Sequence, residues 1–221
     1  MRHLGQPRVL RSASIAALAT ALAVYPRLAG WLNRPDSVGF LEAIIFLCSI
    51  VLWGFVFAWH TPYAHRPVFN FKVEAGPFVA ATLAGMVAAL VFCLGFDPSL
   101  RTRMPEEYPA DLGSWIALTL FLLAFNELFV VFAPFAWLMR LFHNRRVATV
   151  LTVLFGALVL TLKTRSATTP IPTALFAALL VARIGMGFLS VGFYLRGGVF
   201  LVWWWTLLFE ARHLFYLAHP A

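Results

Sequence analysis

The sequence is a series of long apolar runs separated by short polar connections. Most of these runs approach the length of about 20 residues that an α-helix needs to cross the hydrocarbon core of a bilayer. The runs lie near residues 12–31, 40–59, 78–96, 114–139, 147–162, 173–195 and 197–217. The sequence therefore predicts an all-α protein, a polytopic transmembrane helix bundle of about seven spans that forms a single domain over residues 1–221.

The first run leaves two interpretations open. It follows a basic start and contains Ala21, Leu22 and Ala23, features that a cleaved signal peptide also has. Cleavage would leave a bundle of six spans. We favour a retained helix, because small residues such as alanine allow helices to pack closely in a membrane.

Composition agrees with a membrane location. The chain has 221 residues, of which 62% are hydrophobic and 12% charged, and its mean hydropathy is +0.84. A soluble domain has roughly 45–50% apolar and about 25% charged residues. The net charge of +8 comes from Lys and Arg beside the apolar runs, which is a signal of membrane topology. We therefore expect contact with the lipid bilayer and no nucleic-acid partner.

Neither a disulfide nor a metal site is expected. Cys48 and Cys93 both lie inside predicted spans, so they act as small apolar residues. His60 and His65 share one connection, but a metal site needs three or four convergent ligands. No cofactor is predicted, and a haem or pigment ligand at His213 or His60 is the alternative left open.

Glu127 and Arg183 lie near the middle of predicted spans, and Glu210 lies less centrally in the last one. A charge at this depth is costly, so such residues are normally paired and often functional. We predict a buried pair of Arg183 with either Glu127 or Glu210. The pair could fix the packing of the helices, or it could serve catalysis or ion transport.

Trp203, Trp204 and Trp205 are consecutive in the last span. Successive side chains on a helix point about 100° apart, so the three cannot all face one core. We expect at least one of them to contact lipid, a lipid-like ligand or another subunit.

Three segments of the second half, "NELFVVFAPFAWLMRLF", "VATVLTVLFGALVLTL" and "GFLSVGFYLRGGVFLVWWWTLLFEARHLF", resemble the CPBP family of CAAX-protease and bacteriocin-processing intramembrane endopeptidases. The family motifs are Glu-Glu-x-x-x-Arg, Phe-x-x-x-His and a "YLRTGS"-like turn before His-x-x-x-Asn or Asp. In the family, the first motif's glutamate activates water, and the histidines and asparagine complete the site.

This chain departs from the family at nearly every chemical position. The remnant site implied by the resemblance consists of Asn126, Glu127, Val159, Thr206 and Glu210. Valine replaces the motif-two histidine, and Val131 replaces the motif-one arginine. Hydrolysis needs a general base and a general acid, and neither valine nor Asn126 can act as one.

We therefore expect a CPBP-like integral membrane protein of a bacterial inner membrane, with its N-terminus in the cytoplasm, that has lost protease activity. Its expected role is that of a structural or accessory subunit, with other integral membrane subunits as partners. One alternative is an active endopeptidase with a rearranged site using Glu127, Glu210 and His213. Another is a small transporter or channel subunit that uses Glu127 and Arg183.

Overall fold

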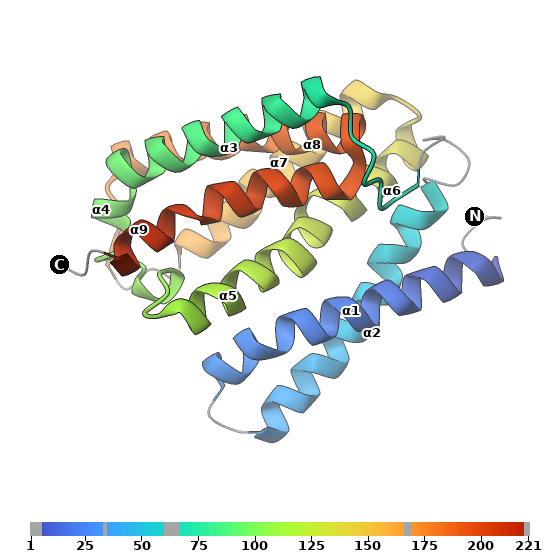
Figure 1. The fold of residues 1–221 in the computed structure, drawn as a ribbon, viewed down its shortest axis with the longest axis horizontal. Helices are drawn as coiled ribbons and strands as arrows, with labels where there is room; N and C mark the ends of the chain where they lie inside the picture. Colours follow the sequence, from blue (N-terminus) through green and yellow to red (C-terminus); the bar gives the residue numbers. More distant parts are fainter. Residues whose placement is uncertain (1–5, 33–34, 60–66, 166–168, 219–221) are drawn as a thin grey trace.

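The structure, a computed structural model, describes residues 6–32, 35–59, 67–165 and 169–218, and the regular elements in these ranges are all helical (Figure 1). The α-helices are α1 (Pro7–Trp31), α2 (Pro35–Trp59), α3 (Ala75–Gly95), α4 (Asp97–Leu100), α5 (Leu112–Phe121), α6 (Ala133–Phe142), α7 (Arg145–Thr164), α8 (Thr173–Glu210) and α9 (Arg212–Ala218). A short 3-10 turn, η2 (Pro105–Glu107), and two π-helical segments, η3 (Leu122–Asn126) and η4 (Leu128–Phe132), complete the described elements.

Within the described ranges, six helical stretches are long and apolar enough to cross a membrane. They begin near Pro7, Pro35, Ala75, Leu112, Arg145 and Thr173. The predicted all-α membrane helix bundle is confirmed, and the chain is an integral membrane protein by length and composition of its helices. Several helices begin before the predicted apolar runs, because polar residues at the interface also join the first helical turn.

The last stretch, residues 173–218, is 46 residues long, and a straight helix of that length would span about 69 Å, over twice a hydrocarbon core of about 30 Å. It instead folds back on itself at Gly198, whose φ of 71° and ψ of −160° are not helical. Trp205 Nε1 donates to Ser190 Oγ at 3.1 Å although the residues are 15 positions apart. The predicted runs 173–195 and 197–217 therefore occupy two arms of a helical hairpin (Figure 1).

The turn of this hairpin requires glycine. A Cβ at Gly198 would lie 3.0 Å from the backbone oxygen of Val68, and the φ of +71° disfavours any other residue. The N–H of Val199 donates to the same Val68 oxygen at 3.3 Å. The segment that leads into α3 thus anchors the point where α8 reverses direction.

The spanning helix between Leu112 and Phe142 is interrupted at its centre. Glu127 N donates to Leu122 O and Ala133 N donates to Leu128 O, each five residues back, as in a π-helix. Pro134 follows directly and has no N–H to complete the regular ladder. The interruption begins well before Pro134 and places Asn126 and Glu127 at the centre of the irregular region.

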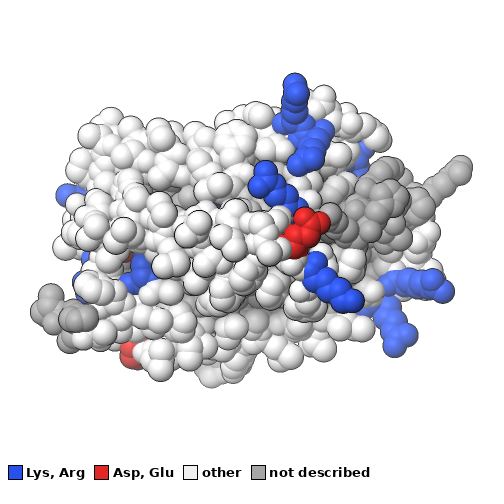
Figure 2. All heavy atoms as spheres, turned by 45° about the horizontal axis from the view of Figure 1, so that its top comes forward, with Lys and Arg blue, Asp and Glu red and all other residues white. Residues whose placement is uncertain are grey.

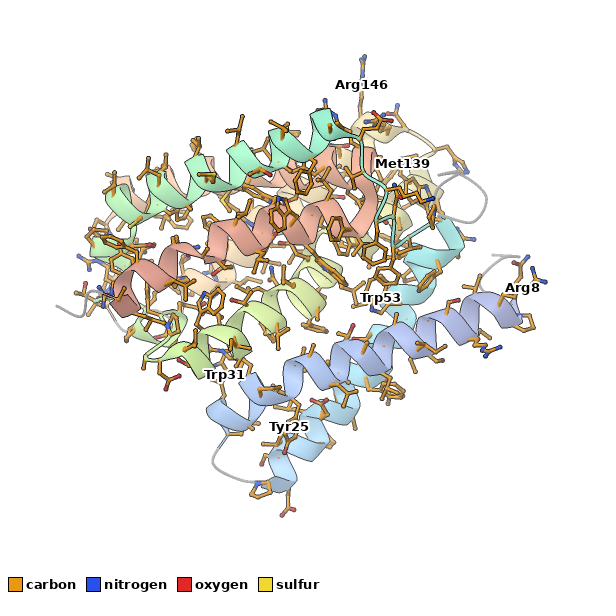
Figure 3. All side chains as sticks on the ribbon, viewed as in Figure 1. Arg8, Tyr25, Trp31, Trp53, Met139 and Arg146 are labelled. Atoms are coloured by element: carbon orange, nitrogen blue, oxygen red, sulfur yellow. The ribbon has the colours of Figure 1, made fainter. Side chains whose placement is uncertain are left out.

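The core is built from buried residues of α1, α2, η4, α6 and both arms of α8. Small residues of α1, among them Ala13 and Ala17, are fully buried, and α1 and α2 cross each other in close contact (Figure 1). Trp53 Nε1 donates to Thr20 Oγ1 at 2.9 Å, which joins the two helices through a buried hydrogen bond. Figure 3 shows Trp53 directed toward the rest of the bundle.

The two ends of the bundle differ in charge. Arg8 and Arg146 lie at the same end in Figure 3, and Trp31 marks the other end of α1. The described cations of the first end are Arg8, Arg11, Lys72, Arg140, Arg145, Arg146 and Arg196, and its described acid is Glu74. The opposite end holds Arg27, Arg101, Arg103, Lys163, Arg165 and Arg212 together with Asp36, Asp97, Glu106, Glu107, Asp111 and Glu210. The first end is therefore basic, whereas charges at the second are balanced.

Candidate functional site

A cavity of about 220 Å³ lies inside the bundle. Residues of α5, η3, α7 and both arms of α8 line it, and the connection before α5 contributes residues toward the charge-balanced end. Apolar side chains such as Leu118, Leu160 and Phe209 alternate with polar ones around the wall. A concave, mostly apolar space with a few convergent polar groups is the usual form of a ligand site.

The five remnant-site positions come together in this cavity. Asn126, Glu127, Val159, Thr206 and Glu210 all line it, although they belong to three separate stretches of the sequence. Arg183 and His213 line it as well. The hairpin at Gly198 makes this possible, because it returns the second arm of α8 alongside the first.

Glu127 is one of the buried polar groups of this cavity. The residue is 5% exposed, and its Oε1 accepts a hydrogen bond from Thr206 Oγ1 at 3.3 Å. The other oxygen, Oε2, is buried and has no hydrogen-bond partner among the described residues. Asn126 faces the same cavity, and Glu127 lies between two π-helical segments. Such segments occur frequently at functional sites.

The buried pair predicted for Arg183 differs from what the structure shows. Arg183 forms no ion pair within 4.0 Å of Glu127 or Glu210. Its Nε lies 3.5 Å from the backbone oxygen of Gly156 instead. Gly156 leaves room for the guanidinium, since a Cβ there would lie 3.3 Å from an Arg183 nitrogen. Arg183 and Glu127 therefore face one cavity without direct contact.

Glu210 has partners that the sequence interpretation did not assign. Its Oε1 lies 3.4 Å from Arg212 Nη1, and its Oε2 lies 3.3 Å from His213 Nε2. Arg212 also pairs with Asp97, at 3.2 Å between Nε and Oδ2. We call Asp97, Tyr108, Glu210, Arg212 and His213 the charge network.

Asp97 is a member of this network that the sequence analysis did not identify. It is 0% exposed, and Tyr108 donates its hydroxyl hydrogen to Asp97 Oδ1 at 2.8 Å. Burial and the adjacent Asp97 carboxylate raise the pKa of Tyr108 well above its usual range. The available signal was position: Asp97 follows the apolar run directly and precedes Pro98, so it begins a short helix at the membrane end.

The connection between α3 and α5 lies at one end of the cavity and is held there by an ion pair and by hydrogen bonds. Glu107 pairs with Lys163, and both line the cavity. Arg27 Nη2 donates to the backbone oxygen of Glu106 at 2.7 Å, and Arg103 Nη1 donates to that of Pro170 at 2.9 Å. Glu107, although it lies in a polar connection, thus has an ionic partner.

The three consecutive tryptophans contact protein in three directions. Trp205 is 1% exposed, so it has no surface for a lipid or a partner. Trp204 Nε1 donates to Thr82 Oγ1 at 2.9 Å, and its ring stacks on Phe78 at 5.2 Å between centroids. Trp203 lies 5.7 Å from Phe69 between centroids. They join α8 to α3, to the segment before α3 and to its own first arm.

Metal binding finds no support in the ranges that the structure covers, where no group of three His, Cys, Asp or Glu could hold an ion. His60 and His65 lie outside the described residues. His213 is buried, and its Nε2 faces Glu210.

No protein-family model matches the chain, and neither a curated protein nor a solved structure matches it significantly.

Proposed function

We propose that this protein is a CPBP-like integral membrane protein that has lost peptidase activity and serves as an accessory subunit of a membrane complex. In this role the cavity holds a polar group of a partner subunit. The observation that carries the proposal is the contrast inside the cavity: Glu210 and His213 are paired, whereas Glu127 Oε2 has no described partner.

The contacts of the acid and base groups support the proposed loss of peptidase activity. A general base must be able to accept a proton from water, and a general acid must reach the leaving amine. Glu210 contacts both His213 and Arg212, and His213 Nε2 faces Glu210. Val159 occupies the wall where the resemblance places a histidine.

Recognition of a partner follows from the groups that remain. Glu127 offers an acceptor, Arg183 offers donors, and Asn126 offers both within one cavity. A peptide amide in an interrupted helix of a partner has a matching donor and acceptor, and burying such a group requires hydrogen-bond partners. Without an occupant, the buried polar groups of the cavity wall would lack these hydrogen-bond partners, which costs free energy.

Purification in mild detergent tests this function. A tagged wild-type chain is expected to retain one or more membrane subunits in constant ratio, and Glu127→Gln together with Arg183→Gln is expected to release them. Glu106→Gln, an exposed change in the connection, serves as the matched control and is expected to retain them. A wild-type chain that purifies alone, without any stoichiometric subunit, would overturn the proposal.

One observation favours a second candidate, an endopeptidase with a rearranged site. Glu127 and the Glu210–His213 pair share the cavity, and His213 Nδ1 has no hydrogen-bond partner among the described residues. Glu127 would then activate water, and His213 would protonate the leaving amine. This candidate predicts cleavage of a tagged membrane substrate that Glu127→Gln abolishes, and an intact substrate with the wild-type chain would exclude it.

A further inference from the structure

The basic end of the bundle contains a hollow that is separate from the cavity. It has a volume of about 460 Å³ and is lined by Glu74, Gly76, Pro77, Arg145, Leu195 and Arg196. These residues come from the starts of α3 and α7 and from the turn of α8. The hollow therefore lies where three spanning elements meet the membrane interface.

The charge around this hollow is strongly positive. Arg145 and Arg196 line it and are exposed. Arg146 follows Arg145 directly, and Lys72 lies two residues before Glu74, the acidic residue of the wall. Figure 2 shows Lys and Arg side chains gathered toward this end of the molecule around an acidic side chain. Cations thus outnumber the acid at the hollow.

Below the cations, the same elements present apolar side chains to the surface. Val79 is exposed on α3 about one helical turn beyond Gly76, and Phe188 and Leu189 are exposed on the first arm of α8, about two turns before Arg196. Leu195 forms part of the wall itself. A polar, cationic rim above an apolar flank matches a phospholipid, with its phosphate at the interface and its acyl chains along the helices.

We propose that this hollow binds the headgroup of an anionic phospholipid, with Arg145 and Arg196 at its phosphate. Arginine suits this role because its planar guanidinium donates two parallel hydrogen bonds to phosphate oxygens. Basic side chains beside a span are also attracted to an anionic leaflet. The inference is independent of the cavity and of the proposed accessory role.

The site places the basic end at the leaflet richer in anionic lipid. Spans carry more Lys and Arg on their cytoplasmic side, and the anionic surface potential is a property of the cytoplasmic leaflet. Arg8 and Arg11 of α1 belong to this same end. The lipid site and a cytoplasmic N-terminus are thus consequences of one charge distribution.

The test measures binding of short-chain phosphatidylglycerol to the full chain in neutral detergent. The thermal unfolding midpoint of the chain is recorded at increasing concentrations of the lipid. The midpoint is expected to rise with phosphatidylglycerol and to stay constant with phosphatidylcholine or inorganic phosphate. Removing an arginine is expected to weaken binding about fivefold, so Arg145→Gln with Arg196→Gln weakens it roughly 25-fold.

Arg103→Gln with Arg165→Gln is the matched control, because it removes the same charge from the opposite end. It is expected to keep the affinity of the wild-type chain. Equal responses to phosphatidylglycerol and phosphatidylcholine would overturn the proposal, as would a response to inorganic phosphate alone. An equal loss of affinity in both double variants would also overturn it, since it would show net charge acting without a site.

If the double variant at the hollow unfolds during purification, native mass spectrometry of Arg196→Lys replaces the thermal assay. Lysine keeps the positive charge but cannot donate two parallel hydrogen bonds to phosphate oxygens as a guanidinium does. Fewer retained anionic lipids than in the wild-type chain support the site, and an unchanged number contradicts it.

Discussion

The charged groups at two sides of the cavity differ in how many partners they have. On one side, Arg212 pairs with both Asp97 and Glu210, and Glu210 also contacts His213. On the other side, Glu127 receives a single hydrogen bond, from Thr206. Paired buried charges hold helices in place, and removing one partner leaves the other buried and uncompensated. Unpaired polar groups are instead available to an occupant.

The largest expected effect is at the centre of the charge network. Arg212→Met leaves Asp97 and Glu210 buried without their shared cation, and we expect a loss of about 3–5 kcal/mol in the free energy of unfolding. Chemical denaturation in detergent measures it. Arg165→Met, an exposed change at the end of α7, is the control. Equal stability of the two variants would show that the network does not support the fold.

The second-largest expected effect is at the turn of the α8 hairpin, which brings the two sides of the cavity together. Gly198→Ala places a side chain at a φ of +71° and against the Val68 oxygen, and we expect a loss of about 3 kcal/mol. Gly192→Ala lies in the first arm with open space around its Cβ and is expected to be neutral or slightly stabilising. Thermal unfolding compares them. A tolerated alanine at position 198 would contradict the glycine-dependent reversal.

A smaller loss of stability is expected when Tyr108, a neutral member of the charge network, is changed. Tyr108→Phe removes the hydrogen bond to Asp97 and is expected to cost about 2 kcal/mol, as for other bonds to charged groups. Because the pKa of Tyr108 is raised in the folded state, the folded chain keeps its proton when the unfolded chain loses it. Stability should therefore fall as pH rises above about 10, the ordinary tyrosine pKa.

The pH dependence has its own control. Unfolding free energies measured from pH 8 to pH 11 should decline more steeply for the wild-type chain than for Tyr108→Phe. Parallel curves for the two chains would show that Tyr108 does not titrate differently in the folded state.

The smallest expected effect on stability is on the unpaired side. Glu127→Gln keeps the size of the side chain and an oxygen for the Thr206 hydrogen bond, so stability should change by no more than about 1 kcal/mol. Partner retention should nevertheless be lost. A loss of stability comparable to that of Arg212→Met would indicate that Glu127 is structural and would remove the contrast between the two sides.

Part of the cavity lining could be predicted from the sequence, but the partners of its charged groups could not. Asn126, Glu127, Val159, Thr206 and Glu210 were grouped through a family resemblance, and the structure brings them to one cavity. The pairing of the charges differs from the predicted pair, because Arg183 lies against the backbone oxygen of Gly156 and Glu210 pairs with Arg212. Pairing depends on where side chains end after packing, which the spacing of charges along a chain does not reveal.

The sequence by itself determined that the chain forms membrane-spanning helices, because apolar runs of bilayer length require their backbone hydrogen bonds to be satisfied internally. It also determined the cost of placing Glu127 and Arg183 within those runs. Only the tertiary structure decided that Asp97 is buried, that α8 folds back at Gly198 and that two charged groups of one cavity remain apart. These features depend on contacts between residues distant in sequence, such as Val68 with Val199 and Asp97 with Arg212.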